Sequence, residues 1–517
     1  MTGDWGWLAP LMFAALFALL LTGYPVAFVL AAVGLIFGAL GVMLGALPIE
    51  LVQAVPERLF GIMRNETLMA IPFFTLMGLI LEKSQLAEDL LDAVNQLFGK
   101  MRGGLAFAVI LVGALLAATT GIVAASVMAM GLISLPMMVR QGYSPAISSG
   151  VIMASGTLAQ IIPPSLVLIV LADTLAVPVG DMYLGALYPS LLLTLLFALF
   201  IGAVALAKPQ WLPAPKEVLP IKWGSLLNAL VPPLVLIFLV LGTIFIGLAT
   251  PTEAGAMGAA GALFLAVAKR RLSISLLHQA LDGTAKLTSF VMFILIGSSL
   301  FALVFRALNG DLWVEHLFDQ LPAGHIAFLL VVNLMVFGLG MFLDFFEIVF
   351  IVVPLLVPII HKLNIDPVWF GILLAMTLQT SFLTPPFGFS LFYLRSVAPK
   401  EINTNHLYKG AIPFIVLQLA MVIVLMAYPN LVRHESDNAP SVFNNINDLS
   451  NVGGQAASAD EAIRLMQEIA KEYQGNNHAT PSSLTKNCCF RRSHCDNRQF
   501  CRPSSYYTTC RTMAFSV

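Results

Sequence analysis

The chain has 517 residues, of which 58% are hydrophobic and 11% are charged, and its formal net charge is −1. Soluble domains carry about 25% charged residues. Together with a mean hydropathy of +0.88, this composition excludes an ordinary soluble protein and indicates a polytopic protein of the lipid bilayer. The near-zero net charge gives no reason to expect a nucleic-acid partner.

Apolar segments recur along most of the chain, and about 20 apolar residues cross a hydrocarbon layer about 30 Å thick. The candidate segments are, in chain order, 6–23, 26–47, 66–82, 104–139, 147–172, 182–207, 228–249, 251–268, 286–308, 324–360, 367–395 and 411–430. Two of them, 104–139 and 324–360, are too long for one ordinary span. The first segment continues into the second across Gly23-Tyr24-Pro25, so we expect no cleaved signal peptide.

Basic residues gather on one side of the predicted membrane. Lys and Arg favour the cytoplasmic ends of short loops. If the side of Lys100 and Arg102 is cytoplasmic, chain parity places there Arg140, Lys208, Lys216, Lys222, Lys269, Arg270, Arg271, Arg395 and Lys400. Arg58, Arg64 and Lys362 fall on the other side. The asymmetry places both chain termini outside the cytoplasm.

Prolines repeat at a fixed spacing in two halves of the chain. Pro136 precedes Pro163 by 27 residues, and the same spacing recurs 222 residues later. Pro145 and Pro367 share that offset of 222. The first long segment begins on the predicted cytoplasmic side and the second on the opposite side. Equal patterns that enter from opposite faces indicate an inverted-topology repeat, which is typical of secondary transporters.

Each long segment carries a polar interruption near its middle. Thr119-Thr120-Gly121 interrupts the first, and Gly338, Gly340, Asp344 and Glu347 lie at the matching depth of the second. Each segment is therefore either two short spans or a re-entrant hairpin, and charge parity does not distinguish them. The absence of a charged loop at Thr119-Thr120-Gly121 favours a buried tip, where non-helical backbone needs protein or a water-filled cavity around it.

A pair of adjacent prolines follows each long segment. Pro163-Pro164 and Pro385-Pro386 each remove two backbone donors and clash with the preceding turn, so the helix must break before them. The breaks free carbonyl groups around 155–160 and 377–384, which suit a small cation such as Na⁺. The N-terminus of the half-helix after each break suits an anion. The alternative is a proline kink relieved by Ser and Thr side chains.

Five stretches carry a resemblance to a known family. They are "LAATTGIVAASVMAMGLISLPMMVRQGYSP", "ASGTLAQIIPPSLVLIVLAD", "LATPTEAGAMGAAGALFLA", "GMFLDFFEIVFIVVPLLVP" and "LQTSFLTPPFGFSLFYLRSVAP". Through them the chain resembles the large membrane subunit of tripartite ATP-independent periplasmic (TRAP) transporters, over most of residues 1–430.

The resemblance implies an all-α polytopic fold with inverted-topology repeats, two re-entrant hairpins at about 104–139 and 324–360, and two broken helices. It implies an elevator-type transporter rather than an enzyme, with no cofactor and with a Na⁺ gradient that drives import of a small organic anion of the carboxylate type. The implied partners are a periplasmic substrate-binding protein and a small four-helix membrane subunit, in the bacterial inner membrane. A proton-coupled carrier or a passive channel of the same fold is the alternative.

The expected division of the chain has six parts. Scaffold helices of the first repeat occupy 1–103, and the first half of the transport domain occupies 104–172. Further scaffold helices occupy 173–308, the second half of the transport domain 309–395, a C-terminal membrane helix 396–433 and a polar tail 434–517.

The resemblance also implies where Na⁺ binds, namely near the hairpin tips and the facing helix breaks. The implied residues are Thr119, Thr120, Gly121, Ser155, Gly156 and Thr157 in the first half, and Gly340, Asp344, Thr380, Ser381 and Thr384 in the second. Pro163, Pro164, Pro385 and Pro386 are the implied helix breakers. The family often has a Gly-Ser-rich first tip, whereas this tip reads Ala-Ala-Thr-Thr-Gly.

Several polar residues have two interpretations. Asp344 is either a functional charge within the membrane or the N-cap of the second half of its hairpin. Glu347 is expected to pair with a neighbour or to line water. Arg306 and Arg395 either attract an anion or extend from helix ends to the interface. The amides Gln160 and Gln379 are expected to make helix–helix hydrogen bonds rather than to touch substrate.

The composition changes beyond Arg433. Residues 434–455 are rich in Asn, Ser and Gly and indicate a linker, while Ser458 and Glu461 predict the capping box of a short surface helix. All five cysteines lie in the last 30 residues, so disulfides do not hold the membrane part together. Their spacing fits no strong zinc template. We expect the tail to be largely disordered.

Overall fold

The computed structural model describes residues 5–20, 22–98, 101–214, 223–319 and 324–432. The predicted helix and the cysteines of the tail lie outside these ranges. The described residues form helices and turns, with no strand. Seven of the helices are long and apolar enough to cross a membrane, or up to eight if the bent pair Phe345–Ile351 and Val353–Lys362 is one span. The prediction of an all-α polytopic membrane protein is confirmed.

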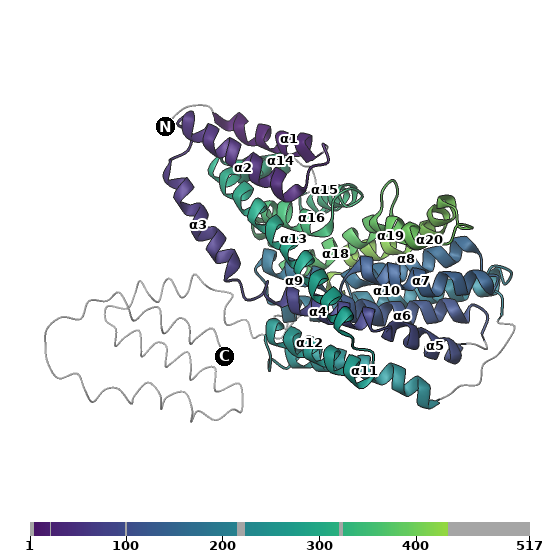
Figure 1. Cartoon of the computed structure of the whole chain (residues 1–517). Helices are drawn as coiled ribbons and strands as arrows, with labels where there is room; N and C mark the ends of the chain where they lie inside the picture. The colour runs from purple at the N-terminus through teal and green to yellow at the C-terminus, as the bar shows by residue number, and fades with distance from the viewer. Residues whose placement is uncertain (1–4, 21, 99–100, 215–222, 320–323, 433–517) are drawn as a thin grey trace, which may run out of the picture. The chain divides into compact units, whose positions relative to one another are not determined.

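The helices form two consecutive sets (Figure 1). The first set is α1 (Leu8–Leu20), α2 (Val26–Met43), α3 (Glu50–Met63), α4 (Ala70–Lys83), α5 (Leu86–Phe98), α6 (Gly104–Thr120), α7 (Val123–Arg140), α8 (Pro145–Thr157), α9 (Leu166–Leu175) and α10 (Val179–Ala207). The second set is α11 (Trp223–Phe245), α12 (Pro251–Ala268), α13 (Ile274–Ala307), α14 (Gly310–Asp319), α15 (Gly324–Leu339), α16 (Phe345–Ile351), α17 (Val353–Lys362), α18 (Pro367–Leu383), α19 (Phe389–Val397) and α20 (Thr404–Ala427).

The two sets correspond element by element. Pro145 begins α8, and Pro367, 222 residues later, begins α18. The two ends of α7 are matched at the same offset by the first residue of α16 and the last residue of α17. The other helices pair within a few residues of that offset: α1 with α11, α2 with α12, α5 with α14, α6 with α15, α9 with α19 and α10 with α20. The repeat predicted from the proline spacing is therefore confirmed and extends over both sets.

The first set contains one break that the second set lacks, because α3 and α4 together match the single helix α13. Asn65 lies at this break, and its side-chain oxygen accepts hydrogen bonds from the backbone of Thr67 at 2.9 Å and of Leu68 at 3.3 Å. Such local side-chain bonds offer the backbone an alternative to the helix. The sequence prediction missed α3, since its residues 50–63 lie between two apolar segments.

The first long segment folds back on itself. α6 ends at Gly121, which has a φ of +60° and takes the left-handed conformation that commonly ends helices at glycine. α7 then returns beside α6. At the open end, the Tyr143 hydroxyl accepts a hydrogen bond from the Leu105 amide at 3.3 Å, so the chain leaves next to where it entered. The expected first hairpin is confirmed.

The second long segment also returns to its starting side. α15 ends at the turn 340–344, and α16 and α17 lead back with a bend of 49° between them. Pro354 lies in the first turn of α17, where its missing N–H interrupts the ladder. Lys362 at the end of α17 contacts Glu315, shortly before α15, at 2.5 Å. Lys362 is one of the basic residues that fall on the predicted non-cytoplasmic side, and this ion pair gives its charge a partner there.

The two hairpins open at opposite ends of α20. Near the first hairpin's open end, a Cβ on Gly410 would lie 2.0 Å from the Ala146 carbonyl, so the start of α20 packs there. At the second hairpin's open end, His325 and Leu363 line a cavity together with Met426. Because α20 spans 24 residues, the repeats are inverted relative to each other.

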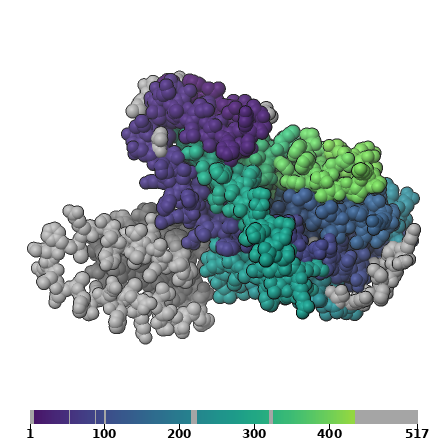
Figure 2. All heavy atoms as spheres, in the orientation of Figure 1, coloured from purple at the N-terminus to yellow at the C-terminus, as the bar shows by residue number. Residues whose placement is uncertain are grey.

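The helices pack in two groups. The frame helices are α1–α4 and α11–α13, in which α2 crosses α13 and α4 packs against α12 and α13. The core helices are α6–α10 and α15–α20. α10, which the expected division groups with the scaffold part 173–308, packs against α6, α9, α18 and α20. In Figure 2 the green surface of α19 and α20 adjoins the blue surface of the first repeat's core helices.

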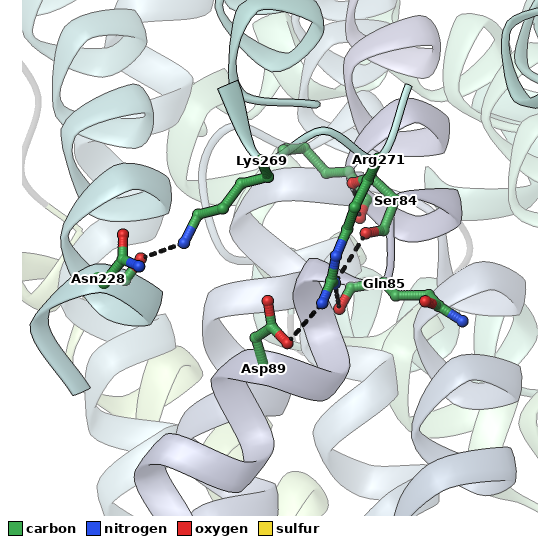
Figure 3. Close-up of polar contacts among 7 residues, drawn as sticks. Ser84, Gln85, Asp89, Asn228, Lys269 and Arg271 are labelled. Atoms are coloured by element: carbon green, nitrogen blue, oxygen red, sulfur yellow. Dashed lines mark hydrogen bonds and ion pairs between the residues drawn. The ribbon is translucent and has the colours of Figure 1, made fainter. Parts of the chain in front are cut away.

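Arg271 joins the end of α4 to the start of α5 (Figure 3). Its guanidinium donates to the backbone carbonyls of Ser84 at 3.1 Å and Gln85 at 2.8 Å and pairs with Asp89 at 2.9 Å. It thereby satisfies carbonyls left free at the C-terminus of α4. Lys269, two residues earlier, donates to the Asn228 carbonyl of α11 at 2.8 Å. The loop between α12 and α13 therefore makes polar contacts with α4, α5 and α11.

We expect Arg271→Lys to lower the thermal unfolding temperature of the purified chain, because an ammonium group cannot reproduce three forked contacts. The loss should be about 1 kcal/mol, since the pair with Asp89 is partly solvent-exposed. Arg270→Lys is the matched control, because Arg270 is exposed and next in sequence. Equal unfolding temperatures for the two variants would contradict this role of Arg271.

A second prediction concerns the crossing of α2 and α13. A Cβ on Gly297 would lie 2.3 Å from the Ala27 carbonyl, so Gly297→Ala should cost about 1–3 kcal/mol through overpacking despite the better helix propensity of alanine. Gly61→Ala, with nothing within 4 Å of the new methyl, should be neutral or stabilising. Thermal unfolding of both variants in detergent measures the difference, and a neutral Gly297→Ala would refute the close crossing.

Candidate functional site: a cavity between two hairpin tips and two broken helices

One cavity of about 550 Å³ adjoins both hairpin tips and both helix breaks. The first tip contributes residues 121–124 and the second residues 342–347. The breaks contribute Gln160 and Leu166 on one side and Phe382, Phe387 and Phe389 on the other. Frame residues 23–26 close part of the wall. Four segments that are far apart in sequence therefore meet at one place, which the inverted repeat makes possible.

Both predicted helix breaks are present. α8 ends at Thr157, a short 3-10 turn follows, and α9 begins at Leu166 after Pro163-Pro164. α18 ends at Leu383 and α19 begins at Phe389 after Pro385-Pro386. Both proline pairs contain a cis peptide bond.

At each break a freed backbone carbonyl accepts a hydrogen bond from a serine hydroxyl. The Ser165 hydroxyl donates to the Gln160 carbonyl at 2.8 Å, and the Ser390 hydroxyl donates to the Phe382 carbonyl at 2.8 Å. Gln160 and Phe382 are equivalent positions, 222 residues apart. A serine therefore covers the same freed carbonyl in both repeats, as buried backbone acceptors require.

The first tip faces the residues after its break. A Cβ on Gly121 would lie 3.3 Å from the Leu166 amide nitrogen and 3.5 Å from the Pro164 carbonyl. The hydroxyls of Thr119 and Thr120 both donate to the Leu116 carbonyl, at 3.0 and 2.8 Å. These two threonines are buried, and only Gly121 of the three predicted tip residues lines the cavity.

The other predicted residues of the first half lie along the arms of the hairpin rather than at its tip. A Cβ on Gly113, in the middle of α6, would lie 2.4 Å from Ser155 Cβ. A Cβ on Gly156 would lie 2.3 Å from a Val127 methyl. Thr157 points instead toward the second repeat, where Gln379 donates to its hydroxyl at 3.5 Å. The structure thus separates the tip residues from 155–157.

In the second half the tip and the broken helix meet directly. A Cβ on Gly340 would lie 2.1 Å from Ser381 Oγ. Ser381 donates to the Leu378 carbonyl at 2.7 Å, and the hydroxyls of Thr380 and Thr384 donate one turn back within α18, at 2.9 and 2.8 Å. Hydroxyls that donate to helix carbonyls keep their own lone pairs for a further partner.

Asp344 and Glu347 form a capping box at the start of α16. The Glu347 carboxylate accepts a hydrogen bond from the Asp344 amide at 2.9 Å. Both residues line the cavity. The N-cap interpretation of Asp344 and the prediction that Glu347 pairs with a neighbour therefore agree with the geometry, although each carboxylate remains next to the cavity.

Three helices begin at the cavity wall. The first residues of α7, α9 and α19 line it, and none of these helices has a side-chain cap. Uncapped N-terminal amides and the helix dipole favour a bound anion. Arg306 and Arg395 are not among the lining residues; they donate to the carbonyls of Pro354 and Ile402.

Sequence reasoning missed the aromatic part of the wall. Phe342, Phe345, Phe346, Phe382, Phe387, Phe389 and Tyr393 line the cavity. The signal was present as a dense run of phenylalanines around the second proline pair, but helix periodicity alone could not assign these rings to one cavity. Tyr24 of the frame also lines it.

Inverted repeats, two hairpins and two broken helices around one cavity define a membrane transporter of the secondary type. The family model for the DctM component of tripartite ATP-independent periplasmic transporters matches residues 13–431. The chain belongs to this family, and it is therefore a transporter permease and not an enzyme.

Two relatives illustrate the family. The C4-dicarboxylate TRAP transporter large permease protein DctM of Pseudomonas aeruginosa is 33% identical over 73% of this chain and 88% of its own length. The 2,3-diketo-L-gulonate TRAP transporter large permease protein YiaN of Escherichia coli is 28% identical over 74% of this chain and 89% of its own length.

The fold also resembles a solved transporter structure. The YdaH transporter of Alcanivorax borkumensis, described as having an unusual topology, superposes with a TM-score of 0.52 over 74% of this chain and 88% of that one, at 16% identity. The likeness supports the arrangement of the helices only.

We expect Gly340→Ala to abolish transport by separating the second tip from α18, because the added methyl would overlap Ser381 Oγ. Gly338→Ala, two residues earlier and with nothing within 4 Å of its methyl, should transport normally. Uptake into proteoliposomes, normalised to the folded protein recovered, measures both. Wild-type uptake by Gly340→Ala would refute a requirement for this contact.

Proposed function

We propose that the chain is the permease subunit of a Na⁺-driven importer of small organic anions. The proposal rests on one observation. Both hairpin tips, both helix breaks and three uncapped helix N-termini adjoin the same cavity. The uncapped helix N-termini suit an anion, and the carboxylates of Asp344 and Glu347 at the wall suit a cation. A coupled carrier needs both kinds of partner close together.

The proposed substrate is a small carboxylate. A carboxylate at the N-termini of α7, α9 or α19 would accept hydrogen bonds from amides that have no side-chain cap. The phenylalanines would pack on the remaining carbon skeleton. The relatives named for C4-dicarboxylate and for 2,3-diketo-L-gulonate point to the same chemical class.

The proposed Na⁺ ligands are those residues of the implied set that lie at the two hairpin tips and at the facing end of α18. Na⁺ is a hard ion and suits oxygen ligands. At the second tip Ser381 lies against Gly340, and Asp344 adds a carboxylate at the cavity wall. In the first half we assign this role to the tip residues Thr120 and Gly121, of which Gly121 lines the cavity.

The proposed movement is an elevator-like shift of the core helices against the frame helices. The packing supports this because the core helices form one group that includes α10 and α20. Among the described residues, polar contacts between the groups include those from Asn65 to Asp173 at 2.7 Å and from Arg306 to the Pro354 carbonyl at 3.3 Å. A second cavity of about 430 Å³ adjoins the first through Ile122, Ala124 and Leu287 and provides a path between frame and core.

The proposed partners follow from the tripartite family name. A periplasmic binding protein would deliver the substrate, and a small membrane subunit would complete the frame. Apolar side chains exposed on the frame helices, such as Phe28, Phe238 and Phe264, suit contact with lipid or with such a subunit. The proposed location is the bacterial inner membrane.

The decisive measurement is uptake of a radiolabelled C4-dicarboxylate into proteoliposomes that hold the chain with its small subunit and binding protein. We expect accumulation only with an inward Na⁺ gradient, and none when K⁺ replaces Na⁺. Liposomes with the binding protein alone are the control. Accumulation driven by a proton gradient without Na⁺ would favour the proton-coupled alternative, and Na⁺-independent equilibration would favour a channel.

A further inference from the structure

Three buried polar side chains converge at the centre of the core helices. Thr157 of α8, Gln379 of α18 and Gln418 of α20 are each 0% exposed. Both amide nitrogens point to the Thr157 hydroxyl, from Gln379 at 3.5 Å and from Gln418 at 3.3 Å. The hydroxyl itself donates to the Ala154 carbonyl at 2.9 Å. None of these three residues lines the transport cavity.

The cluster lies on the axis that relates the two repeats. Thr157 and Gln379 are separated by 222 residues, the offset of the repeat. Two positions that a twofold axis exchanges can touch each other only at the axis. Thr157 and Gln379 therefore hold the two repeats together at their centre, and Gln418 adds the last core helix.

In the arrangement described, the cluster leaves two buried acceptors without a partner. The side-chain oxygens of Gln379 and Gln418 have no hydrogen-bond partner. The two nitrogen–oxygen distances also exceed the usual range of about 2.7–3.2 Å for an N–H···O hydrogen bond. Buried amide oxygens normally have a partner. The geometry thus indicates a missing ligand.

Rotating each amide by a half-turn exchanges its nitrogen and oxygen. Both amide oxygens then face the Thr157 hydroxyl, at 3.3 Å from Gln418 and 3.5 Å from Gln379. Hard cations bind oxygens at about 2.3–2.6 Å, so ligands at right angles around one ion lie about 3.3–3.7 Å apart. The observed separations are those of ligands that share an ion.

We propose that a small monovalent cation of the Na⁺ type binds at this axial site, held by Thr157 Oγ1 and the side-chain oxygens of Gln379 and Gln418. All three ligands are neutral, which favours a monovalent over a divalent ion. The ion joins α8, α18 and α20 and stays within the core. This inference does not depend on Na⁺-driven transport, because the axial site is separate from the hairpin tips and the transport cavity.

The test is thermal unfolding of the full-length chain in nanodiscs as NaCl replaces choline chloride at constant ionic strength. A ligand that binds only the folded state raises the unfolding temperature with its concentration. We expect Gln418→Leu and Thr157→Val each to raise the half-maximal Na⁺ concentration at least ten-fold or to abolish the effect. Thr284→Val is the matched control, since Thr284 is buried and bonds a helix carbonyl in the frame.

Gln418→Glu keeps the length and the oxygen of the side chain and covers the case in which the leucine variant does not fold. Its carboxylate should make the Na⁺-dependent rise larger than in wild type. Wild-type titration curves for these variants, or no Na⁺ effect on the wild type, would overturn the proposal and leave a buried water as the missing ligand. Na⁺-independent uptake combined with a Gln418-sensitive stabilisation would reject Na⁺ coupling and retain the axial site.

Discussion

The structure depends on one constraint: where a helix breaks at a proline pair, the carbonyls that lose their helical partners need other partners in a medium that offers the backbone no water. Pro163-Pro164 and Pro385-Pro386 lack amide donors, so carbonyls upstream lose their helical partners. A carbonyl without a hydrogen-bond partner inside the bilayer costs free energy, because no water is available there. In each repeat a serine hydroxyl donates a hydrogen bond to the equivalent carbonyl, at 2.8 Å in both cases. The broken backbone is thereby stable enough to face a cavity.

The inverted repeat places two such breaks next to one cavity. A single broken helix would present one dipole end and one set of oxygens. Two inverted copies bring both breaks and both hairpin tips to a single cavity of about 550 Å³. The N-termini of α7, α9 and α19 point their uncapped amides there, while Asp344 and Glu347 cap α16 with charge from the protein itself. The proposed binding of an anion together with a cation rests on this arrangement.

Much of the fold and part of the site follow from the sequence. The proline offset of 222 predicted the repeat, and the polar interruptions predicted where each long segment is interrupted. The resemblance to the family, rather than the interruptions alone, implied that both segments are hairpins. Gly340 and Ser381 were expected together and lie together. Ser155 and Gly156 were grouped with the first tip but lie along its arms. Which residues face a tip depends on the rotation and the depth of each packed helix, and neither is a local property.

The sequence by itself determined which segments repeat and that the helices break at Pro163-Pro164 and Pro385-Pro386, where polar residues and a repeated spacing accompany the prolines. The pair Pro232-Pro233 lies inside the continuous helix α11, so a proline pair alone does not decide a break. The tertiary structure alone decided that Thr157 meets Gln379 and Gln418 on the repeat axis, that α10 and α20 pack with the core, and that a wall of phenylalanines closes the cavity. These relations come from close packing between distant segments; Thr157 and Gln418, for example, are 261 residues apart. No local pattern encodes such distances.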